Sequence, residues 1–331
     1  MATCLDHDLN LRNALGHFEP YIAAEPSLNP QVLRLGIIGM SEGNGHPYSW
    51  AAICNGYDKE AMSNCPFPAI PEYLGREKYP ESFLDSARVT HVWTQDSAIS
   101  NEIANASKIP HVVDRLEAML GHVDAILLAR DDAHNHIRFA EPFLRESIPV
   151  FVDKPLALSR KEALRLFSMA AGTKLFTCSA LRFAPELKLS PRRRRALGRI
   201  QFIDAHVPNS WEKYAVHVIE PILQHFPEAD EISSYQRYAA SDVRYVSVRW
   251  RSGLVTRFSA LGPVSCAISY TVYGDKGTAT LTFRKPFAAF RSALSEFVKI
   301  VGGSGANIPT DFTLKVVDII ELGTRGNASD G

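Results

Sequence analysis

The sequence of 331 residues has no excess of charge of either sign, because 36 Lys and Arg residues balance 36 Asp and Glu residues. A neutral chain argues against a nucleic-acid surface built on bulk positive charge. Long hydrophobic runs are also lacking: residues 125–129 form one of the longest, far short of the roughly 20 residues that a membrane helix needs. The first residues carry an acid early and lack the apolar stretch of a secretory signal.

Cysteine is scarce: the chain has five, an odd number, and none stands in a Cys-x-x-Cys spacing. This usage is typical of buried or free thiols in a reducing compartment, so the cytoplasm is the predicted location. Cysteine–histidine spacings typical of zinc are missing, and the scattered His134, His136 and His217 do not indicate a metal site. We therefore expect no metal, no membrane and no nucleic acid among the partners.

The first half of the chain contains short apolar runs, each followed by a helical stretch. Continuous apolar runs of this length are typical of buried parallel strands. Strands that alternate with helices predict a doubly wound parallel sheet. The predicted strands cover residues 33–39, 87–94, 123–129, 150–152 and 174–180. Residues 58–86 are long for a connection between such elements and are interpreted as an insertion.

From residue 199 the pattern changes to strand-like runs joined by short turns, which is typical of an antiparallel sheet. One helix is predicted around residues 214–225, and helices over 287–301 and 310–323 close the chain. The sequence therefore predicts an N-terminal extension over residues 1–31, a Rossmann dinucleotide-binding domain (α/β) over 32–180 and an α+β domain over 181–331.

The turn after the first predicted strand is rich in glycine and polar residues. Glycines at such a turn let the backbone approach a pyrophosphate, which rests on the N-terminus of the following helix. Ser41 and Asn44 stand where the second and third glycines of a dinucleotide fingerprint belong, so a plain glycine turn is the alternative. The residues expected to bind a cofactor here are Gly39, Ser41, Glu42, Gly43, Asn44, Gly45 and His46.

A second candidate follows the strand predicted over residues 150–152, where Asp153, Lys154 and Pro155 come in order. A lysine at the carboxyl end of a buried strand can lie in the active-site crevice, where its charge stabilises a developing alkoxide. The alternative is a solvated charge pair before a helix.

The third candidate is the segment 211–220. On one helix, Lys213, His217 and Glu220 lie at i, i+4 and i+7 and share a face. A histidine titrates close to working pH, so His217 is predicted as a general base, and the alternative is a helix histidine bonded to a neighbouring carbonyl. The four arginines at 192–195 indicate phosphate or nucleic-acid recognition or a solvated helix face, and the neutral chain favours the last.

Five segments, in this order, resemble the Gfo/Idh/MocA family, which is named for glucose–fructose oxidoreductase and inositol dehydrogenase. They are the GIIG turn, VDAILLA with His136 after it, VFVDKPLALS, SALRF and YGDKGTATL. The most specific is VDKP, the family's Glu-Lys-Pro with Asp for Glu. The resemblance runs from about residue 33 to the last helix. It implies a Rossmann domain followed by an α+β domain that binds substrate and whose open sheet forms a homodimer or homotetramer.

The resemblance also implies an enzyme that uses NAD(P) to transfer a hydride to or from a carbinol or keto carbon of a sugar, sugar nucleotide or cyclitol. It assigns catalysis to Lys154, Asp153 and His217. Arg182, Lys213, Tyr214 and His217 would border this small-molecule substrate. Lys213 departs from the family's Asp, which leaves a non-catalytic dinucleotide- or sugar-binding protein as the alternative.

The same resemblance places Thr94 where the family carries its ribose-binding acid, with Gln95 and Asp96 next to it. Asp96 discourages a 2′-phosphate, so NAD is the expected cofactor and NADP the alternative. The residues after the strand over 123–129 would line the cofactor, although two adjacent acids are a departure from the family and can instead cap the following helix. These residues are Asp131, Asp132 and His136.

Overall fold

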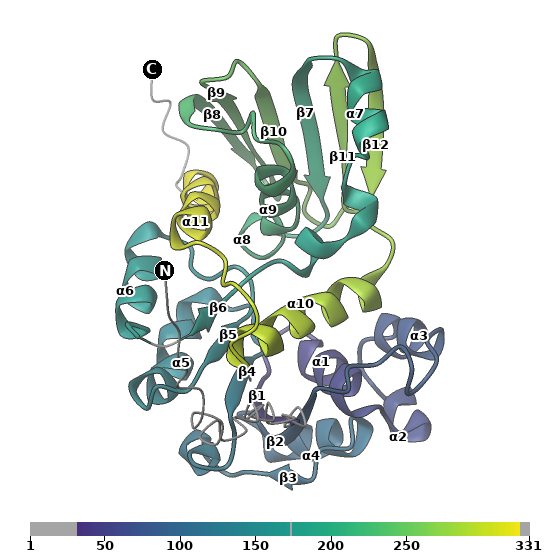
Figure 1. Cartoon of the computed structure of the whole chain (residues 1–331), viewed down its shortest axis with the longest axis vertical. Helices are drawn as coiled ribbons and strands as arrows, with labels where there is room; N and C mark the ends of the chain where they lie inside the picture. Colours follow the sequence, from purple (N-terminus) through teal and green to yellow (C-terminus); the bar gives the residue numbers. More distant parts are fainter. Residues whose placement is uncertain (1–31, 173, 325–331) are drawn as a thin grey trace, which may run out of the picture. The chain divides into compact units, whose positions relative to one another are not determined.

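The computed structural model describes residues 32–172 and 174–324 (Figure 1). The N-terminal extension expected over residues 1–31 lies outside the described residues. No helix in the described part of the chain is long and apolar enough to cross a membrane. Four cysteines fall within it; all are free thiols, and Cys54, Cys65 and Cys178 are buried.

The first half of the chain forms a six-stranded sheet in the order β3-β2-β1-β4-β5-β6, and every neighbouring pair is parallel. This confirms the predicted doubly wound sheet. The chain adds one short strand that the sequence did not predict, β3, which has two residues. The strands are β1 (Leu33–Ile38), β2 (Ala87–Trp93), β3 (His111–Val112), β4 (Ala125–Leu128), β5 (Val150–Val152) and β6 (Leu175–Phe176).

Helices cover both faces of this sheet because its strands alternate between two hydrophobic cores. Leu35 and Ile37 point into a core with α1, α4 and α10, whereas Ile38 and Leu128 point into a core with α5, α6 and part of α11 (Thr310–Thr324). The helices are α1 (His46–Asn55), α4 (Ser97–Ala106), α5 (His136–Arg145), α6 (Arg160–Met169) and α10 (Pro286–Val301). The segment interpreted as an insertion contains the short helices α2 (Lys59–Ser63) and α3 (Ala69–Gly75).

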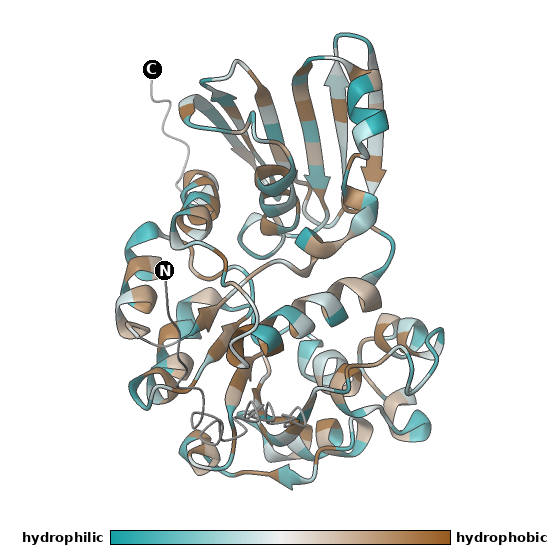
Figure 2. Ribbon diagram, in the orientation of Figure 1, coloured by the Kyte–Doolittle hydropathy of each residue, from teal (hydrophilic) through white to brown (hydrophobic). Residues whose placement is uncertain are grey.

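The second sheet also has six strands, in the order β12-β11-β7-β10-β9-β8. It is antiparallel except for the parallel pair β10–β7, which confirms the mostly antiparallel prediction. Buried and more exposed positions alternate along β7, and hydrophobic and hydrophilic bands alternate along the same strand in Figure 2. The strands are β7 (Ile200–Val207), β8 (Ile232–Ala240), β9 (Val243–Trp250), β10 (Val255–Ala260), β11 (Ser269–Gly274) and β12 (Gly277–Thr282).

Helices α9 and α11 pack their apolar side chains into the core on one face of this sheet. The helix predicted around 214–225 corresponds to α9, and it follows the short helix α8, with Ala215 in a helical conformation between the two. The helices of this half are α7 (Pro191–Leu197), α8 (Trp211–Tyr214), α9 (Val216–His225) and α11 (Thr310–Thr324). The arginine run 192–195 lies on α7, as the solvated-helix interpretation expected.

The strand predicted over 174–180 ends early, after Phe176. The reason is Ser179, whose hydroxyl accepts the N–H of Leu181 at 3.2 Å and begins a 3₁₀ turn over Ala180–Phe183. Serine favours such local hydrogen bonds over a strand ladder.

Helices α11 and α8 are in such close contact that no space remains for a Cβ at Gly323. Trp211 is buried, its indole N–H donates to the carbonyl of Ile320 at 2.8 Å, and a Cβ at Gly323 would lie 2.1 Å from Trp211 Cε2. We expect Gly323→Ala to lower the free energy of unfolding by about 1–3 kcal/mol, measured by urea denaturation. Gly75→Ala is the matched control, because no neighbouring atom lies within 4 Å of its Cβ position. Equal stability of the two variants would contradict this packing.

Candidate functional site

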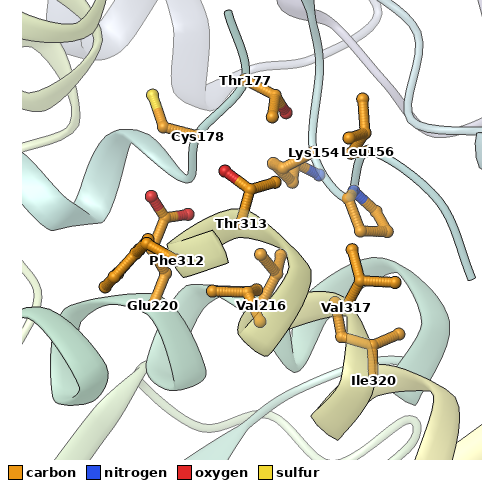
Figure 3. A pocket seen from close by; sticks show the side chains of 12 residues that line it. Lys154, Leu156, Thr177, Cys178, Val216, Glu220, Phe312, Thr313, Val317 and Ile320 are labelled. Carbon is orange, nitrogen blue, oxygen red and sulfur yellow. The ribbon is translucent and has the colours of Figure 1, made fainter. Parts of the chain in front are cut away.

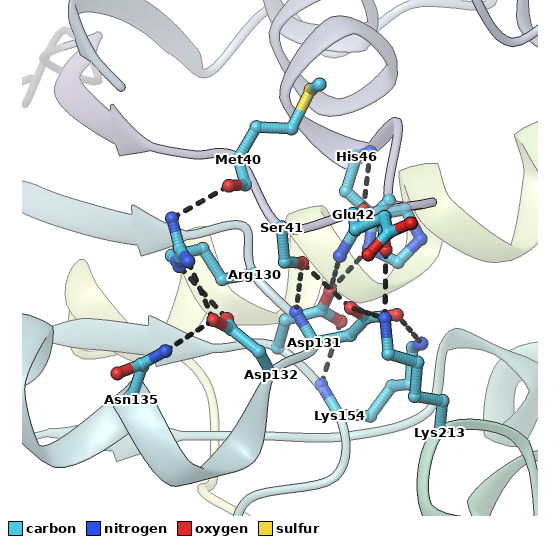
Figure 4. Close-up of polar contacts among 12 residues, drawn as sticks. Met40, Ser41, Glu42, His46, Arg130, Asp131, Asp132, Asn135, Lys154 and Lys213 are labelled. Carbon is cyan, nitrogen blue, oxygen red and sulfur yellow. Dashed lines mark hydrogen bonds and ion pairs between the residues drawn. The ribbon is translucent and has the colours of Figure 1, made fainter. Parts of the chain in front are cut away.

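The candidate site lies at the carboxyl ends of β1, β4 and β5, where a parallel sheet gathers its loops. The glycine turn over residues 39–45 follows β1, Asp131 follows β4, and Asp153 and Lys154 follow β5. Figure 4 shows these segments joined by hydrogen bonds and ion pairs.

The two departures from the glycine fingerprint connect the turn to the neighbouring strands. Ser41 Oγ donates to Asp131 Oδ1 at 2.8 Å and accepts the Asp131 N–H at 3.1 Å. Asn44 Oδ1 accepts the His46 N–H at 2.8 Å, while its Nδ2 donates to Asp153 Oδ2 at 2.9 Å. Ser41 therefore joins the turn to β4, and Asn44 joins it to β5.

The turn keeps the backbone features of an anion site. A Cβ on Gly39 would lie 2.5 Å from Pro47 Cγ, so the end of β1 packs directly on α1. Gly43 has φ of +75° and nothing within 4 Å of its Cβ position. The backbone N–H groups of Ser41, Glu42 and Gly43 have no hydrogen-bond partner among the described residues, so they are available to an anionic ligand.

Asp131 is a buried carboxylate held by two lysines. Its oxygens lie 3.5 Å from Lys154 Nζ and 3.1 Å from Lys213 Nζ. Burial raises the pKa of Asp131, but Lys154, the Ser41 hydroxyl and Lys213 outweigh it and lower the pKa to about 2. The carboxylate is therefore ionised throughout the working range of pH.

The two lysines differ in exposure. The Lys154 side chain is 6% exposed, and its ammonium lies 5.6 Å from the centre of the Tyr214 ring. The Lys213 side chain is 34% exposed, and its ammonium also donates to the backbone carbonyl of Glu42 at 2.9 Å. Lys213 thus connects α8 to the glycine turn, a contact that the sequence did not predict.

Asp153 is also buried, with 1% of its side chain exposed. Its carboxylate accepts hydrogen bonds from Asn44 Nδ2, from His46 Nδ1 at 2.6 Å and from the Lys154 N–H at 2.8 Å. The Asp153–His46 pair was not predicted, because 107 residues separate its members.

His217 bonds to Ser179 Oγ through Nδ1 at 2.8 Å. Burial, followed by the charges of Lys154 and His46, lowers the pKa of His217 well below its ordinary value. A lowered pKa favours the neutral ring and opposes titration close to working pH, and the role of His217 as a general base stays a prediction. Lys213 lies on α8 and contacts Asp131, whereas His217 lies on α9 and has Asp131 among the charges that act on its pKa, so the helix face that the two were predicted to share stays a prediction.

Glu220, the third residue predicted on this helix face, contacts Ser179 and Arg182. It accepts the Ser179 N–H at 2.6 Å and the Arg182 guanidinium at 2.7 Å, and burial raises its pKa despite this arginine. Figure 3 shows Glu220 beside a void of about 10 Å³ that Lys154 and Thr313 also line. This volume is at the lower limit for one water molecule, so the void is no ligand site.

The residues predicted after β2 make bonds with one another and with the glycine turn. Thr94 is buried, and its hydroxyl donates to the Asp96 carbonyl at 2.5 Å. Asp96 caps α4 by accepting the Ala98 N–H at 2.8 Å. Gln95 Oε1 accepts the Met40 N–H at 3.0 Å, and Gln95 Nε2 donates to the Met40 carbonyl at 2.7 Å. Of Thr94, Gln95 and Asp96, Gln95 is therefore the residue whose side chain contacts the glycine turn.

Arg130 was missed by the sequence analysis. Its guanidinium forms an ion pair with Asp132 at 2.6 Å and donates to the Met40 carbonyl and to Gln95 Oε1. His136 is fully buried, and its ring nitrogens lie 2.9 and 2.7 Å from the backbone carbonyls of Leu156 and Arg130. Asp132 and His136 thus position Arg130. The hydrogen bond from Arg130 to Gln95 joins the loops after β4 and β2, and no local sequence pattern indicates it.

A cavity of about 550 Å³ opens beside Asp131 and Lys213. It lies between the glycine turn and loops of the second sheet, and most of its lining side chains are polar or charged. Its lining residues are Glu42, Gly43, Asp131, Asn209, Ser210, Lys213, Tyr214, Asp242, Gly262 and Pro263. Of the residues predicted to border the substrate, Lys213 and Tyr214 are among them, and Arg182 and His217 are not; Lys154 and Asp153 reach the lining only through Asp131 and the glycine turn.

The chain is similar to known proteins in its sequence pattern and its fold. Residues 33–179 match the family model described as an oxidoreductase family with an NAD-binding Rossmann fold. The comparison with curated proteins finds no match. Among solved structures, apo scyllo-inositol dehydrogenase from Lactobacillus casei is 13% identical, with a TM-score of 0.66, and covers 88% of this chain and 95% of its own.

Two other solved structures have the same fold. UDP-N-acetylglucosamine 3-dehydrogenase GnnA from Acidithiobacillus ferrooxidans is 13% identical, with a TM-score of 0.64 over 88% of this chain and 96% of its own. Biliverdin reductase from Synechocystis, in complex with biliverdin and NADP+, is 13% identical, with a TM-score of 0.62 over 88% and 98%. At these identities the likeness shows the shared two-sheet fold.

The depressed pKa of Asp131 predicts how stability depends on pH. The folded pKa, about 2, lies below the ordinary value of 3.8, so the ionised form contributes stability above pH 4, and this contribution is lost as pH falls towards 2. We expect Asp131→Asn to lower the free energy of unfolding at neutral pH by on the order of 2 kcal/mol, at about 1.4 kcal/mol per pKa unit.

The measurement is urea denaturation of both proteins from pH 2 to pH 7. The difference between them should shrink as pH falls from 4 to 2. Asp85→Asn, at an exposed position with no ion pair among the described residues, is the control and should change stability little. A difference that is constant over this range would show that the two lysines do not stabilise the carboxylate.

Proposed function

Because residues 33–179 match the model of the Gfo/Idh/MocA oxidoreductase family, described as having an NAD-binding Rossmann fold, we propose that the chain is an NAD(P)-dependent dehydrogenase or reductase. The substrate is a sugar, sugar nucleotide or cyclitol, and the reacting atom is a carbinol or keto carbon. The observation that carries the proposal is Lys154, a buried lysine at the end of β5 that contacts an ionised carboxylate of the polar cavity.

The residues after β1 fit a nicotinamide dinucleotide. The unpartnered N–H groups of Ser41, Glu42 and Gly43 are suited to its pyrophosphate, and the open space at Gly43 leaves room for close approach. Gln95 and Asp96 are the polar groups at the end of β2, where such folds hold the adenosine ribose. The bound nicotinamide supplies the hydride acceptor or donor.

The chain's own residues act on the substrate oxygen. The Lys154 ammonium stabilises the negative charge that develops there, and because the lysine is buried its charge is screened less than in water. His217, which stays neutral, can hold the same oxygen by a hydrogen bond. Asp131 keeps Lys154 and Lys213 in place.

The cavity suits a substrate with several hydroxyl groups. Asn209 and Ser210 offer both donors and acceptors, Asp242 adds an acceptor, and Lys213 adds a donor. Arg182 serves such a substrate indirectly, because it pairs with Glu220 beside the Ser179–His217 bond.

The second sheet provides a surface for self-association. Its face opposite α9 carries the aromatic pairs Phe202–Tyr273 and Tyr238–Tyr245, with ring centres 5.7 and 5.2 Å apart. A homodimer or homotetramer formed through this face would bury them, and aromatic residues are enriched at such interfaces. Light scattering of the purified protein tests this part of the proposal.

Replacement of Lys154 tests the proposed chemistry. We expect Lys154→Ala to leave folding and cofactor affinity nearly unchanged and to reduce turnover by about 100-fold or more, because the interaction is made mainly in the transition state. The measurement is steady-state kinetics with a panel of polyols and sugar nucleotides, together with cofactor titration. Lys161→Ala, at an exposed position on α6, is the control and should keep full turnover.

Two results would overturn the proposal in different ways. Normal turnover of Lys154→Ala would show that the reaction takes place elsewhere. Cofactor binding by the wild-type protein, without turnover of any polyol or sugar, would support the non-catalytic binding protein.

Cofactor choice provides a separate test. We expect NAD to bind about 10-fold more tightly than NADP, or about 1.4 kcal/mol. Asp96 opposes a 2′-phosphate, and Arg130, the cation at Gln95, is already paired with Asp132. Titration of both cofactors into the protein at fixed salt measures the ratio. A clear NADP preference would show that Arg130 leaves Asp132 to bind the phosphate, and Arg130→Gln should then remove that preference.

A further inference from the structure

Two histidines lie close to Lys154, on different elements. His46 is the first residue of α1, and His217 belongs to the first turn of α9. The Asp153 carboxylate accepts hydrogen bonds from both His46 Nδ1 and the Lys154 N–H. The Tyr214 ring lies 5.6 Å from the Lys154 ammonium and 5.5 Å, centre to centre, from the His217 ring. Each histidine ring makes one hydrogen bond through Nδ1, but the two partners differ in kind.

The partner of His46 is the Asp153 carboxylate, which can only accept hydrogen bonds. Asp153 already receives hydrogen bonds from Asn44 and from the Lys154 N–H, and its Oδ2 lies 2.6 Å from His46 Nδ1. The proton of a neutral His46 ring is therefore on Nδ1, and Nε2 carries a lone pair. Nε2 has no partner among the described residues, and the side chain is 16% exposed.

The His46 ring is fixed in this orientation by packing. It stacks on Trp50, with centres 4.9 Å apart and planes at 14°, and meets the edge of Phe290 at 5.1 Å. Because the ring is held on two sides as well as by Asp153, it cannot easily rotate to exchange its two nitrogens.

The partner of His217 is a donor. Ser179 is fully buried, and its oxygen already accepts the Leu181 N–H at 3.2 Å, so its own proton needs an acceptor. His217 Nδ1, at 2.8 Å, is the acceptor that the structure provides. A neutral His217 therefore carries its proton on Nε2, the opposite arrangement to His46.

We propose that His46 and His217 enter the reaction as opposite tautomers, with His46 Nε2 as the proton acceptor and His217 Nε2–H as a hydrogen-bond donor. This inference rests on the proposed function and moves the general base from His217 to His46. Asp153 and Ser179 are the positioning residues that fix the two tautomers.

The proton transfer balances without a further reactant. In oxidation the substrate O–H bond breaks, the proton bonds to His46 Nε2, and the electron pair stays on the oxygen. The His217 N–H and the Lys154 ammonium hold that oxygen. The positive charge on the His46 ring is stabilised by the Asp153 carboxylate 2.6 Å from Nδ1. In reduction the same proton returns from His46 to the oxygen.

Nitrogen NMR of the full-length protein, labelled with ¹⁵N-histidine and free of cofactor, measures the tautomers directly. Signals of His46 and His217 are assigned from the spectra of His46→Asn and His217→Asn. We expect an Nδ1–H ring at His46 and an Nε2–H ring at His217 at neutral pH. Identical tautomers at the two positions, or a protonated Nε2 at His46, would overturn the inference.

Two variants separate positioning from general stability. Ser179→Ala should abolish the tautomer preference of His217 and leave that of His46 unchanged, and Asp153→Asn should do the reverse. A purely structural role would alter both rings together or neither, and either result counts against the inference. His46→Asn should lower kcat for oxidation by at least about 100-fold with a small change in KM.

The NMR result does not depend on turnover. A protein without activity but with the expected tautomers would contradict the proposed function and leave the tautomer assignment supported. A protein with full activity in His46→Asn would refute the role of His46 as the base, whatever the tautomers are.

Discussion

The buried carboxylate of Asp131 is the interaction on which the site depends. It joins three segments that are distant in sequence: the glycine turn through Ser41, the end of β5 through Lys154, and α8 through Lys213. An ionised group with 6% of its side chain exposed is stable only when opposite charges and hydrogen-bond donors surround it. The folded site therefore needs all three segments in contact with Asp131, and the cavity lies between two of them, the glycine turn and α8, beside loops of the second sheet.

The carboxylates and the lysines at the site are equal in number. Asp131 and Asp153 provide two carboxylates, and Lys154 and Lys213 provide two ammonium groups. Removal of one buried partner leaves an uncompensated charge, which costs more than the pair contributes. This explains why Lys213 stands at a position where related sequences are expected to carry an acid. With a third carboxylate there, Lys154 would be the one lysine facing three carboxylates, whereas a lysine completes the balance and leaves Lys154 as the less exposed of the two.

The sequence predicted the parts of the structure that local patterns encode. The apolar runs of β1, β4 and β5 and the turn residues after them placed Lys154, Asp153 and the glycine turn at one edge of a parallel sheet. The missed features are contacts between distant segments: Asp153 with His46, Arg130 with Gln95, and α10 with the first sheet. No local pattern distinguishes a histidine that meets a carboxylate from one that meets a hydroxyl. The contrast between His46 and His217 therefore appears only in the folded chain.

The altered glycine fingerprint now has a physical interpretation. A second or third glycine leaves space for a cofactor and makes no contact of its own. Ser41 and Asn44 instead use their side chains to hold Asp131 and Asp153, and the backbone N–H groups of residues 41–43 remain without partners among the described residues. Anion binding by a turn requires those N–H groups and not the glycines themselves. The substitutions therefore keep the means of binding a pyrophosphate, and they tie the same turn to the two carboxylates that orient Lys154 and His46.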